Sequence, residues 1–285
     1  MELPGRVVAI TGGARGIGRS IAAALAREGA RVAIGDVDPD AAEATAAELG
    51  GEVVALAVDV SDRDSVEGFA EAVEDRLGPI DVWINNAGIL LVGPFLEEDD
   101  AATERQFAIN IMGVVHGMRV ALPRLRSRGR GQLINIASGA SYTVPPGEVT
   151  YAATKHAVLA LTDGVRQELA GSGVTVTAVF PGLVRTELAK GTQAPRATKW
   201  ITPEDVAEGV VKGIAHDRME VFVPREMAPL LRISRAATAR GRLWLARLFG
   251  MEEVATKTDP AERADYMERI GLRPEQAGKG TGRDA

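Results

Sequence analysis

The chain has 285 residues, a length that a single large α/β domain can account for. It contains no cysteine, which excludes disulfide bonds and thiolate catalysis. The 33 basic and 39 acidic residues give a formal net charge of −6, which argues against a general nucleic-acid-binding surface. The first residues carry no secretory signal pattern, and no apolar run is long enough to cross a membrane, so the sequence predicts a cytoplasmic protein.

The amino terminus predicts a strand, a glycine-rich turn and a helix. Val7 to Ile10 is a short apolar run typical of a buried parallel strand, and residues 19–28 have helical spacing. Glycines between them let the backbone approach a pyrophosphate, whose charge is stabilised by the N–H groups at the helix start. A second strand, Arg31 to Gly35, leads to Asp36, where a carboxylate can hydrogen-bond a ribose. The turn reads Thr11-Gly12-Gly13-Ala14-Arg15-Gly16-Ile17-Gly18.

Short apolar strands and helical stretches continue to alternate along the chain. Such alternation predicts one α/β domain, a Rossmann-type doubly wound parallel sheet with helices on both faces. Helices are expected at 65–77, 103–125 and 151–170, and further strands at 53–58, 82–85, 132–137, 174–180 and 221–223.

Tyr151 and Lys155 are four residues apart at the start of a helical stretch, so both side chains face the same way. A free phenol has a pKa of about 10, and a nearby ammonium stabilises the phenolate, which makes the pair suitable as an acid/base unit. An isolated pair of this spacing is more often a surface tyrosine beside a solvated lysine. The other motifs of this chain favour the functional interpretation.

Taken in order, these motifs resemble those of the short-chain dehydrogenase/reductase family, and the likeness runs from about Val7 to Pro224. The resemblance implies a single Rossmann-type domain with an NAD(P)-dependent alcohol/ketone redox site. The matching motifs are the glycine turn, Asp59-Val60, Asn85-Asn86-Ala87-Gly88, Asn110, Ser138, Tyr151-x-x-x-Lys155, and Pro181-Gly182 with Thr186.

The resemblance assigns a catalytic role to four residues. Tyr151 would be the general acid/base, and Lys155 would lower the pKa of Tyr151 and hydrogen-bond the nicotinamide ribose. Ser138 would hold the substrate oxygen, although a serine at a strand end is by itself more often a turn former. Asn110 would place a water in a proton relay to the lysine. No metal site is expected, because the three histidines lack suitable partners.

NAD is the expected cofactor, because a carboxylate at Asp36 accepts hydrogen bonds from a ribose diol and repels a 2′-phosphate. Arg15 argues for NADP, since family members that use NADP often carry a basic residue in the glycine turn; we rank Asp36 higher. Asp59 and Val60 are expected at the adenine. The full cofactor set is Gly12, Arg15, Gly16, Ile17, Gly18, Asp36, Asp59, Val60, Asn86, Ala87, Gly88, Tyr151, Lys155, Pro181, Gly182, Val184 and Thr186.

The substrate is expected to be a hydrophobic secondary alcohol or ketone, with alcohol oxidation by NAD as the favoured direction. The alternative is an NADPH-dependent reductase of a ketone or 3-oxoacyl group. Residues 187–200, between two ordered motifs, predict a substrate lid within a catalytic domain that spans 1–224. An apolar cavity without a fixed cation is expected from Leu90, Leu91, Val92, Tyr142, Val144, Leu183, Leu188 and Trp200.

Residues 225–272 predict an amphipathic, arginine-rich helical extension, and 273–285 a disordered tail. The extension is expected to pack on the domain or on a partner subunit; contact of 225–250 with an anionic membrane is the less favoured interpretation. Two alternatives belong to a functional class other than enzymes: an NAD-binding scaffold, and a peripheral membrane protein without turnover. The apolar helices predict a homodimer or homotetramer. Helical spacing groups Leu230, Ile233, Ala237, Trp244 and Leu248 opposite Arg232, Arg235, Arg240, Arg242 and Arg247.

Overall fold

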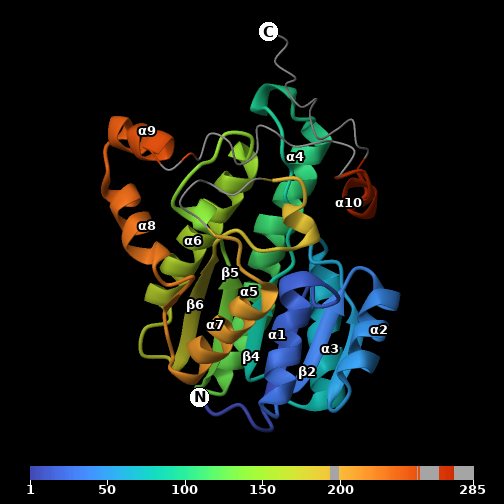
Figure 1. Cartoon of the computed structure of the whole chain (residues 1–285). Helices are drawn as coiled ribbons and strands as arrows, with labels where there is room; N and C mark the ends of the chain where they lie inside the picture. Colours follow the sequence, from blue (N-terminus) through green and yellow to red (C-terminus); the bar gives the residue numbers. More distant parts are fainter. Residues whose placement is uncertain (193–198, 249, 251–262, 273–285) are drawn as a thin grey trace.

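Seven parallel strands form one sheet in the order β3-β2-β1-β4-β5-β6-β7, which confirms the predicted fold class (Figure 1). The computed structural model describes residues 1–192, 199–248, 250 and 263–272. Each predicted strand is present, and the strands other than the half-buried edge strand β3 are largely buried on both faces, as is typical of a parallel sheet. The strands are β1 Val7–Thr11, β2 Arg31–Asp36, β3 Val53–Ala57, β4 Val82–Asn85, β5 Gly131–Ile136, β6 Val174–Pro181 and β7 Glu220–Val223.

Helices cover both faces of the sheet. On one face α1, α2 and α7 bury side chains such as Ile21 and Val206, and on the other α3, α5 and α6 bury Phe69, Met118 and Val158. The carboxyl ends of the strands therefore open at one edge between the two layers, where ligands of such folds bind. The helices are α1 Gly16–Arg27, α2 Pro39–Leu49, α3 Arg63–Leu77, α4 Asp100–Phe107, α5 Gly113–Ser127, α6 Val149–Glu168, α7 Pro203–Ala215, α8 Met227–Ala236, α9 Ala239–Leu248 and α10 Ala264–Arg269.

Two helices that the sequence analysis did not predict, α2 and α7, begin with clear capping residues. The Asp38 side chain accepts a hydrogen bond from the N–H of Ala41, and α2 follows with a proline in its first turn. At α7, Thr202 and Asp205 form a reciprocal capping box. Both signals can be read in the sequence, since an N-cap residue before proline marks a helix start.

The helix predicted over 103–125 is interrupted at its middle. A π-helical turn, Ala108–Met112, separates α4 from α5 and contains Asn110. A π turn inserts one extra residue and frees local backbone bonding, and such turns are frequent at functional sites.

The described part of the extension after β7 contains the helices α8, α9 and α10, and the faces predicted from helical spacing are wrong. Leu231 and Ser234 are the buried residues of α8, whereas Ile233, Trp244 and Leu248 are more than half exposed. Two of the arginines help to dock α8, because Arg232 pairs with Glu220 at 2.7 Å and Arg235 with Asp163 at 4.0 Å. In Figure 1, α8 and α9 form an arm beside the β7 edge.

Among the described residues, no helix combines the length and the apolar character that a membrane span requires. The predicted tail, 273–285, and the centre of the predicted lid, 193–198, lie outside the described residues.

Candidate active site

The glycine turn leads into α1 at the carboxyl edge of the sheet. Gly12 and Gly16 have φ of 65° and 52°, values that favour glycine. A Cβ at Gly18 would lie 2.1 Å from the carbonyl oxygen of Gly12, so no larger residue fits there. The first turn of α1 contains no acidic residue and no side-chain cap, and it lines a cavity of about 1160 Å³. These features fit an anionic pyrophosphate at the start of α1.

Asp36 lies at the end of β2 and lines the same cavity. Its carboxylate accepts hydrogen bonds from the N–H groups of Ala14 at 3.0 Å and Asp38 at 3.2 Å. Arg15 is held by an ion pair with Asp38 at 2.6 Å, and the hydrogen bond from Arg15 is the main reason that the pKa of Asp38 lies below its ordinary value. The charge of Arg15 is thus balanced by Asp38, while the Asp36 carboxylate lines the cavity beside this pair.

Asn86 holds the glycine turn in place through its side-chain amide. Its amide donates to the carbonyls of Thr11 at 3.0 Å and Gly12 at 2.8 Å, while the Thr11 hydroxyl accepts from the N–H groups of Asn86 and Ala87. Asn86 therefore fixes the glycine turn against β4 as well as lining the cavity. Thr11, which the sequence analysis did not assign to the site, is its partner.

The other predicted cofactor residues also surround this cavity. The Asp59 carboxylate accepts hydrogen bonds from the N–H and hydroxyl of Ser61, at 2.9 and 2.6 Å, which fixes the loop after β3. At the opposite end, the Gly182 N–H donates to the carbonyl of Val223 at 2.7 Å and holds the chain after β6. The cavity-lining set that matches the predictions is Gly12, Arg15, Gly16, Ile17, Gly18, Asp36, Asp59, Val60, Asn86, Ala87, Gly88, Tyr151, Lys155, Pro181, Gly182, Val184 and Thr186.

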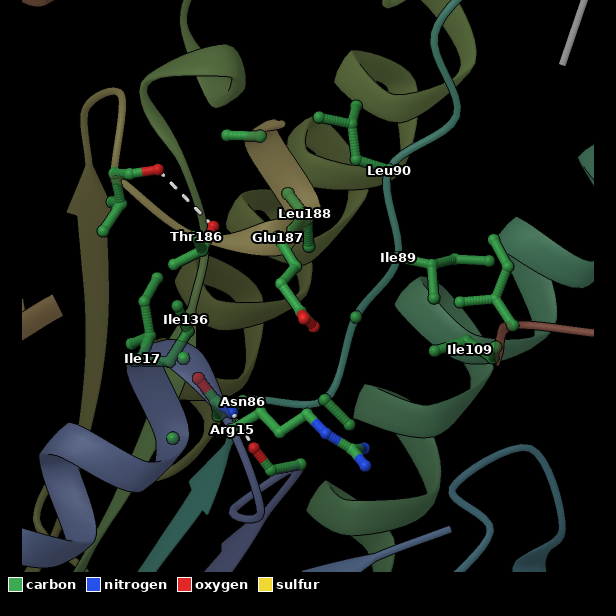
Figure 2. Close-up of a pocket in the computed structure, with 18 of the residues that line it drawn as sticks. Arg15, Ile17, Asn86, Ile89, Leu90, Ile109, Ile136, Thr186, Glu187 and Leu188 are labelled. Carbon is green, nitrogen blue, oxygen red and sulfur yellow. Dashed lines mark hydrogen bonds between the residues drawn. The ribbon is translucent and has the colours of Figure 1, made fainter. Parts of the chain in front are cut away.

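Figure 2 shows the cavity with Arg15 and Asn86 toward one end and Leu90 toward the other. Ile17 and Ile136 lie between these ends, close to Asn86 in the view. The polar end matches a dinucleotide phosphate and ribose, and the end near Leu90 matches an apolar substrate.

Ser138, Tyr151 and Lys155 meet at the cavity wall. Ser138 follows β5 and its hydroxyl accepts from the N–H of Ala140 at 3.1 Å, so it is both a turn former and a cavity residue. Lys155 is buried on α6, and its Nζ donates to the carbonyl of Ile136 at 3.0 Å. The same Nζ lies 5.7 Å from the centre of the Tyr151 ring. One serine, one phenol and one ammonium thus converge from β5 and α6.

Asn110 lies behind this group, in the π turn. Its Oδ1 accepts from the N–H of Ile89 at 2.8 Å, and its Nδ2 donates to the Ile89 carbonyl at 2.8 Å and to the Thr154 hydroxyl at 3.1 Å. A Cβ at Gly88 would lie 3.3 Å from Asn110 Oδ1 and 3.6 Å from Lys155 Nζ. Asn110 therefore holds the loop after β4 close to the lysine.

The pKa values at this wall depend mainly on burial. Burial raises the pKa of Tyr151, a hydrogen bond with Ser138 acts in the opposite direction, and the charge of Glu148 raises it further. The net direction is upward, so the lowering of this pKa by Lys155 stays a prediction. Burial also lowers the pKa of Lys155, to about 8. Burial therefore favours the neutral phenol of Tyr151, and its phenolate form increases as the pH rises.

The predicted substrate residues are divided between two cavities. Leu90 and Leu188 line the first, and a second cavity of about 1390 Å³ is lined by Tyr142, Val144 and Trp200. Leu183 lines both. Leu91 and Val92 are in neither lining and pack in small apolar clusters instead. The expectation of no fixed cation is wrong, because Lys199, Arg235 and Arg242 reach the second cavity.

The carboxyl-terminal segment supplies site residues that the sequence analysis missed. Arg263 is almost completely buried, and its guanidinium donates to the carbonyls of Leu90 at 2.7 Å, Leu188 at 3.2 Å and Lys190 at 2.7 Å. The Tyr266 hydroxyl accepts from the N–H of Leu90 at 2.8 Å. These bonds tie the loop after β4 to the segment after β6, and α10 closes the apolar end of the first cavity.

Glu148 is another site residue that the sequence analysis missed. It is 6% exposed, precedes α6 and lines both cavities. Burial raises its pKa to about 7, and the charge of Arg263 acts in the opposite direction.

Replacing Glu148 with glutamine should stabilise the protein at pH 8 but not at pH 4. Between about 4.5 and 7 the folded carboxyl keeps a proton that the unfolded chain has lost, so wild-type stability falls as the pH rises through this window. The gain at pH 8 should reach up to about 3 kcal/mol. Urea unfolding of both proteins at the two pH values measures the difference in their free energies of unfolding. A difference that is the same at both pH values would contradict the burial argument.

Comparisons with known proteins agree with this geometry. The family model of the short chain dehydrogenases matches residues 6–197. The chain is 41% identical over 231 residues to a 1-deoxy-11-beta-hydroxypentalenate dehydrogenase of Streptomyces exfoliatus, covering 78% of this chain and 84% of the relative. It is also 41% identical over 195 residues to a sorbitol dehydrogenase of Cereibacter sphaeroides, covering 68% of this chain and 76% of that one.

Two solved structures are similar. A short chain dehydrogenase/reductase from Burkholderia phymatum in complex with NAD has a TM-score of 0.75 and 29% identity, covering 81% of this chain and 93% of that one. A 3-ketoacyl-(acyl-carrier-protein) reductase from Brucella melitensis complexed with NADH has a TM-score of 0.72 and 27% identity, covering 78% of this chain and 97% of that one. With its glycine turn, parallel sheet and Ser-Tyr-Lys wall, the chain belongs to the short chain dehydrogenase family and is an oxidoreductase.

Proposed function

We propose that this enzyme oxidises a hydrophobic secondary alcohol to a ketone, with NAD as the hydride acceptor. The observation that carries the proposal is that Ser138, Tyr151 and Lys155 line the same cavity as the glycine turn and Asp36. The relatives named as hydroxypentalenate and sorbitol dehydrogenases support alcohol chemistry, and the similar structures that hold NAD and NADH support the cofactor.

Each catalytic side chain has a defined task in this proposal. The Ser138 hydroxyl holds the substrate oxygen, and the Tyr151 phenolate takes the hydroxyl proton as the alcohol is oxidised. Lys155 is positioned by the Ile136 carbonyl to bind the nicotinamide ribose, and its positive charge favours the phenolate once the site excludes water. NAD, when bound, supplies the acceptor for the hydride that leaves the carbinol carbon.

Asn110 and the carboxyl-terminal segment position these groups. Asn110 holds Ile89 through both backbone atoms, so that the loop after β4 stays against the cofactor end of the cavity. Arg263 and Tyr266 hold Leu90, one residue further along that loop. We infer that residues 225–248 and 263–272 thus complete the substrate side of a catalytic domain formed by 1–224, with 187–192 and 199–200 as the described parts of the lid.

The direct experiment is a screen of oxidised NAD with steroid, terpene and aliphatic secondary alcohols, followed by the absorbance of the reduced nicotinamide. Turnover of at least one alcohol, with NAD preferred to NADP, is expected. Turnover confined to NADPH with ketones or 3-oxoacyl thioesters would replace this proposal by a carbonyl reductase. A scaffold without turnover is disfavoured, because such a role does not require Asn110, Ser138, Tyr151 and Lys155 together.

We propose a homo-oligomer as the working form. Phe107 and Met112 around the π turn and Val149 at the start of α6 are exposed by 40%, 42% and 37%, although all three are apolar. Burying such side chains between copies is a common use of helices in symmetric assemblies. Light scattering should therefore give the mass of a dimer or tetramer at micromolar concentration, and a monomer would contradict this.

A further inference from the structure

The second cavity opens directly at the catalytic wall. It shares Ser138, Glu148 and Gly182 with the first cavity, and it extends from there beneath α8 and α9. The two cavities therefore adjoin at Ser138, while Tyr151 lines the first cavity alone. A molecule held by Ser138 can thus have its reacting carbon in the first cavity and the rest of its body in the second.

The far wall of the second cavity is made by the extension. Leu230 and Leu231 line it from α8, and Leu243, Leu245 and Ala246 line it from α9. Both helices lie beyond residues 6–197, the part that the family model matches. This wall therefore lies outside the part of the chain that the family model matches.

The helix α9 does not pack into the core. None of its described residues is buried, yet Leu243, Leu245 and Ala246 line the cavity. An apolar helix face normally buries itself against another apolar surface, and an apolar occupant of the cavity would supply one.

Three cations reach this cavity, and two of them have partners outside it. The Arg235 guanidinium pairs with Asp163 and lies 5.7 Å from the centre of the Tyr142 ring. Arg242 donates to the carbonyl of Ala237 at 2.8 Å. Lys199 is the third cation, so the wall made by α8 and α9 brings no cation that lacks a partner. The cavity volume of about 1390 Å³ exceeds the roughly 300–1,000 Å³ typical of pockets for drug-sized ligands.

We propose that the second cavity binds the apolar body of the substrate, so that the enzyme acts on secondary alcohols with a long or polycyclic hydrocarbon body. This inference rests on the proposed function. It assigns Leu231, Leu245 and Ala246 as residues that determine specificity through the size of the body they accept.

The test compares alcohols that share one reacting group. For wild type, kcat/KM should rise at least about 30-fold from butan-2-ol to octan-2-ol, since each buried methylene contributes up to about fourfold. Replacing Ala246 with phenylalanine puts a ring into the cavity from a helix without buried residues. The ratio of the two kcat/KM values should then fall at least tenfold.

The matched control is Ala236→Phe, at the exposed end of α8 and outside the cavity lining. This variant should keep the wild-type ratio of kcat/KM for octan-2-ol to kcat/KM for butan-2-ol. A ratio near one in wild type, or an unchanged ratio in Ala246→Phe, would overturn the proposal. If Ala246→Phe instead changes the oligomeric mass and leaves the ratio intact, a second copy occupies the cavity and the proposal is wrong.

Binding is measured separately from turnover. Trp200 lines the cavity, so dodecan-2-ol should change tryptophan emission saturably, and Trp200→Phe should abolish the change. If no alcohol or ketone is turned over with either cofactor, the proposed function fails. In that case a saturable emission change that Ala246→Phe weakens still supports an apolar ligand site, and the absence of any change overturns the inference as well.

Discussion

Replacing Tyr151 with phenylalanine should lower turnover of the best alcohol by about 100-fold or more while NAD binding stays near normal. The phenyl ring keeps the contacts of Tyr151 with its apolar cluster, which includes Leu90, Val92 and Ala140. Only the hydroxyl that exchanges the proton is removed. Steady-state kinetics and titration of the cofactor by fluorescence measure the two effects separately.

The variant Lys155→Ala tests the two roles proposed for the lysine. Lys155 is expected both to bind the nicotinamide ribose and to favour the phenolate, so its loss should reduce cofactor affinity and turnover together. Because burial raises the pKa of Tyr151, alcohol oxidation by wild type should accelerate as the pH rises above neutral. Ordinary turnover in Tyr151→Phe would rule out its assignment as the acid/base. A Lys155→Ala variant altered in cofactor affinity alone would rule out its influence on the phenol.

The second large effect is expected on the preference for NAD over NADP when Asp36 is replaced. Wild type is expected to prefer NAD over NADP by at least about 10-fold, because losing a charge-assisted hydrogen bond and gaining a repulsion each cost on the order of 1.4 kcal/mol. Asp36→Ala should narrow or reverse that preference. Asp36→Asn serves as the matched variant, since an amide oxygen can still accept from Ala14 while the negative charge is gone.

The ion pair between Arg15 and Asp38 provides a further test of cofactor preference. Asp38→Asn removes the charge that balances Arg15, so it should raise NADP affinity while leaving the NAD site intact. Tighter binding of NADP than NAD by wild type would show that Arg15 governs the ribose end despite this pair. The physiological direction would then shift toward carbonyl reduction.

The sheet could be predicted from sequence because its signals are local. Apart from the half-buried edge strand β3, the strands are short, mostly apolar runs buried on both faces, and no predicted strand end differs from the observed one by more than one residue. The helices α2 and α7 were missed although Asp38-Pro39 and Thr202-Pro203 mark their starts, because apolar spacing received more weight than capping.

The site could be predicted where its residues follow strands. Ser138 follows β5, Asp36 ends β2 and the glycine turn follows β1, and the carboxyl ends of parallel strands meet at one edge. Arg263 and Tyr266 could not be found in this way. They reach Leu90 from a segment far along the chain, and only tertiary structure brings them there.

The faces of α8 could not be read from helical spacing either. The prediction assumed that apolar side chains point inward and arginines outward. In the structure Arg232 and Arg235 reach Glu220 and Asp163, while Ile233 remains exposed. A helix at the sheet edge can dock through long charged side chains, whose stems pack while their ends pair.

The most direct test of the central claim is the transfer of the carbinol hydrogen itself. A secondary alcohol labelled with deuterium on the carbinol carbon is incubated with the enzyme and NAD, and the reduced cofactor is analysed by mass spectrometry. The account predicts one deuterium in each reduced nicotinamide, one ketone per reduced cofactor, and neither product at a comparable rate with Tyr151→Phe. Reduced cofactor without deuterium, or no reduction with any alcohol of the panel, would contradict it.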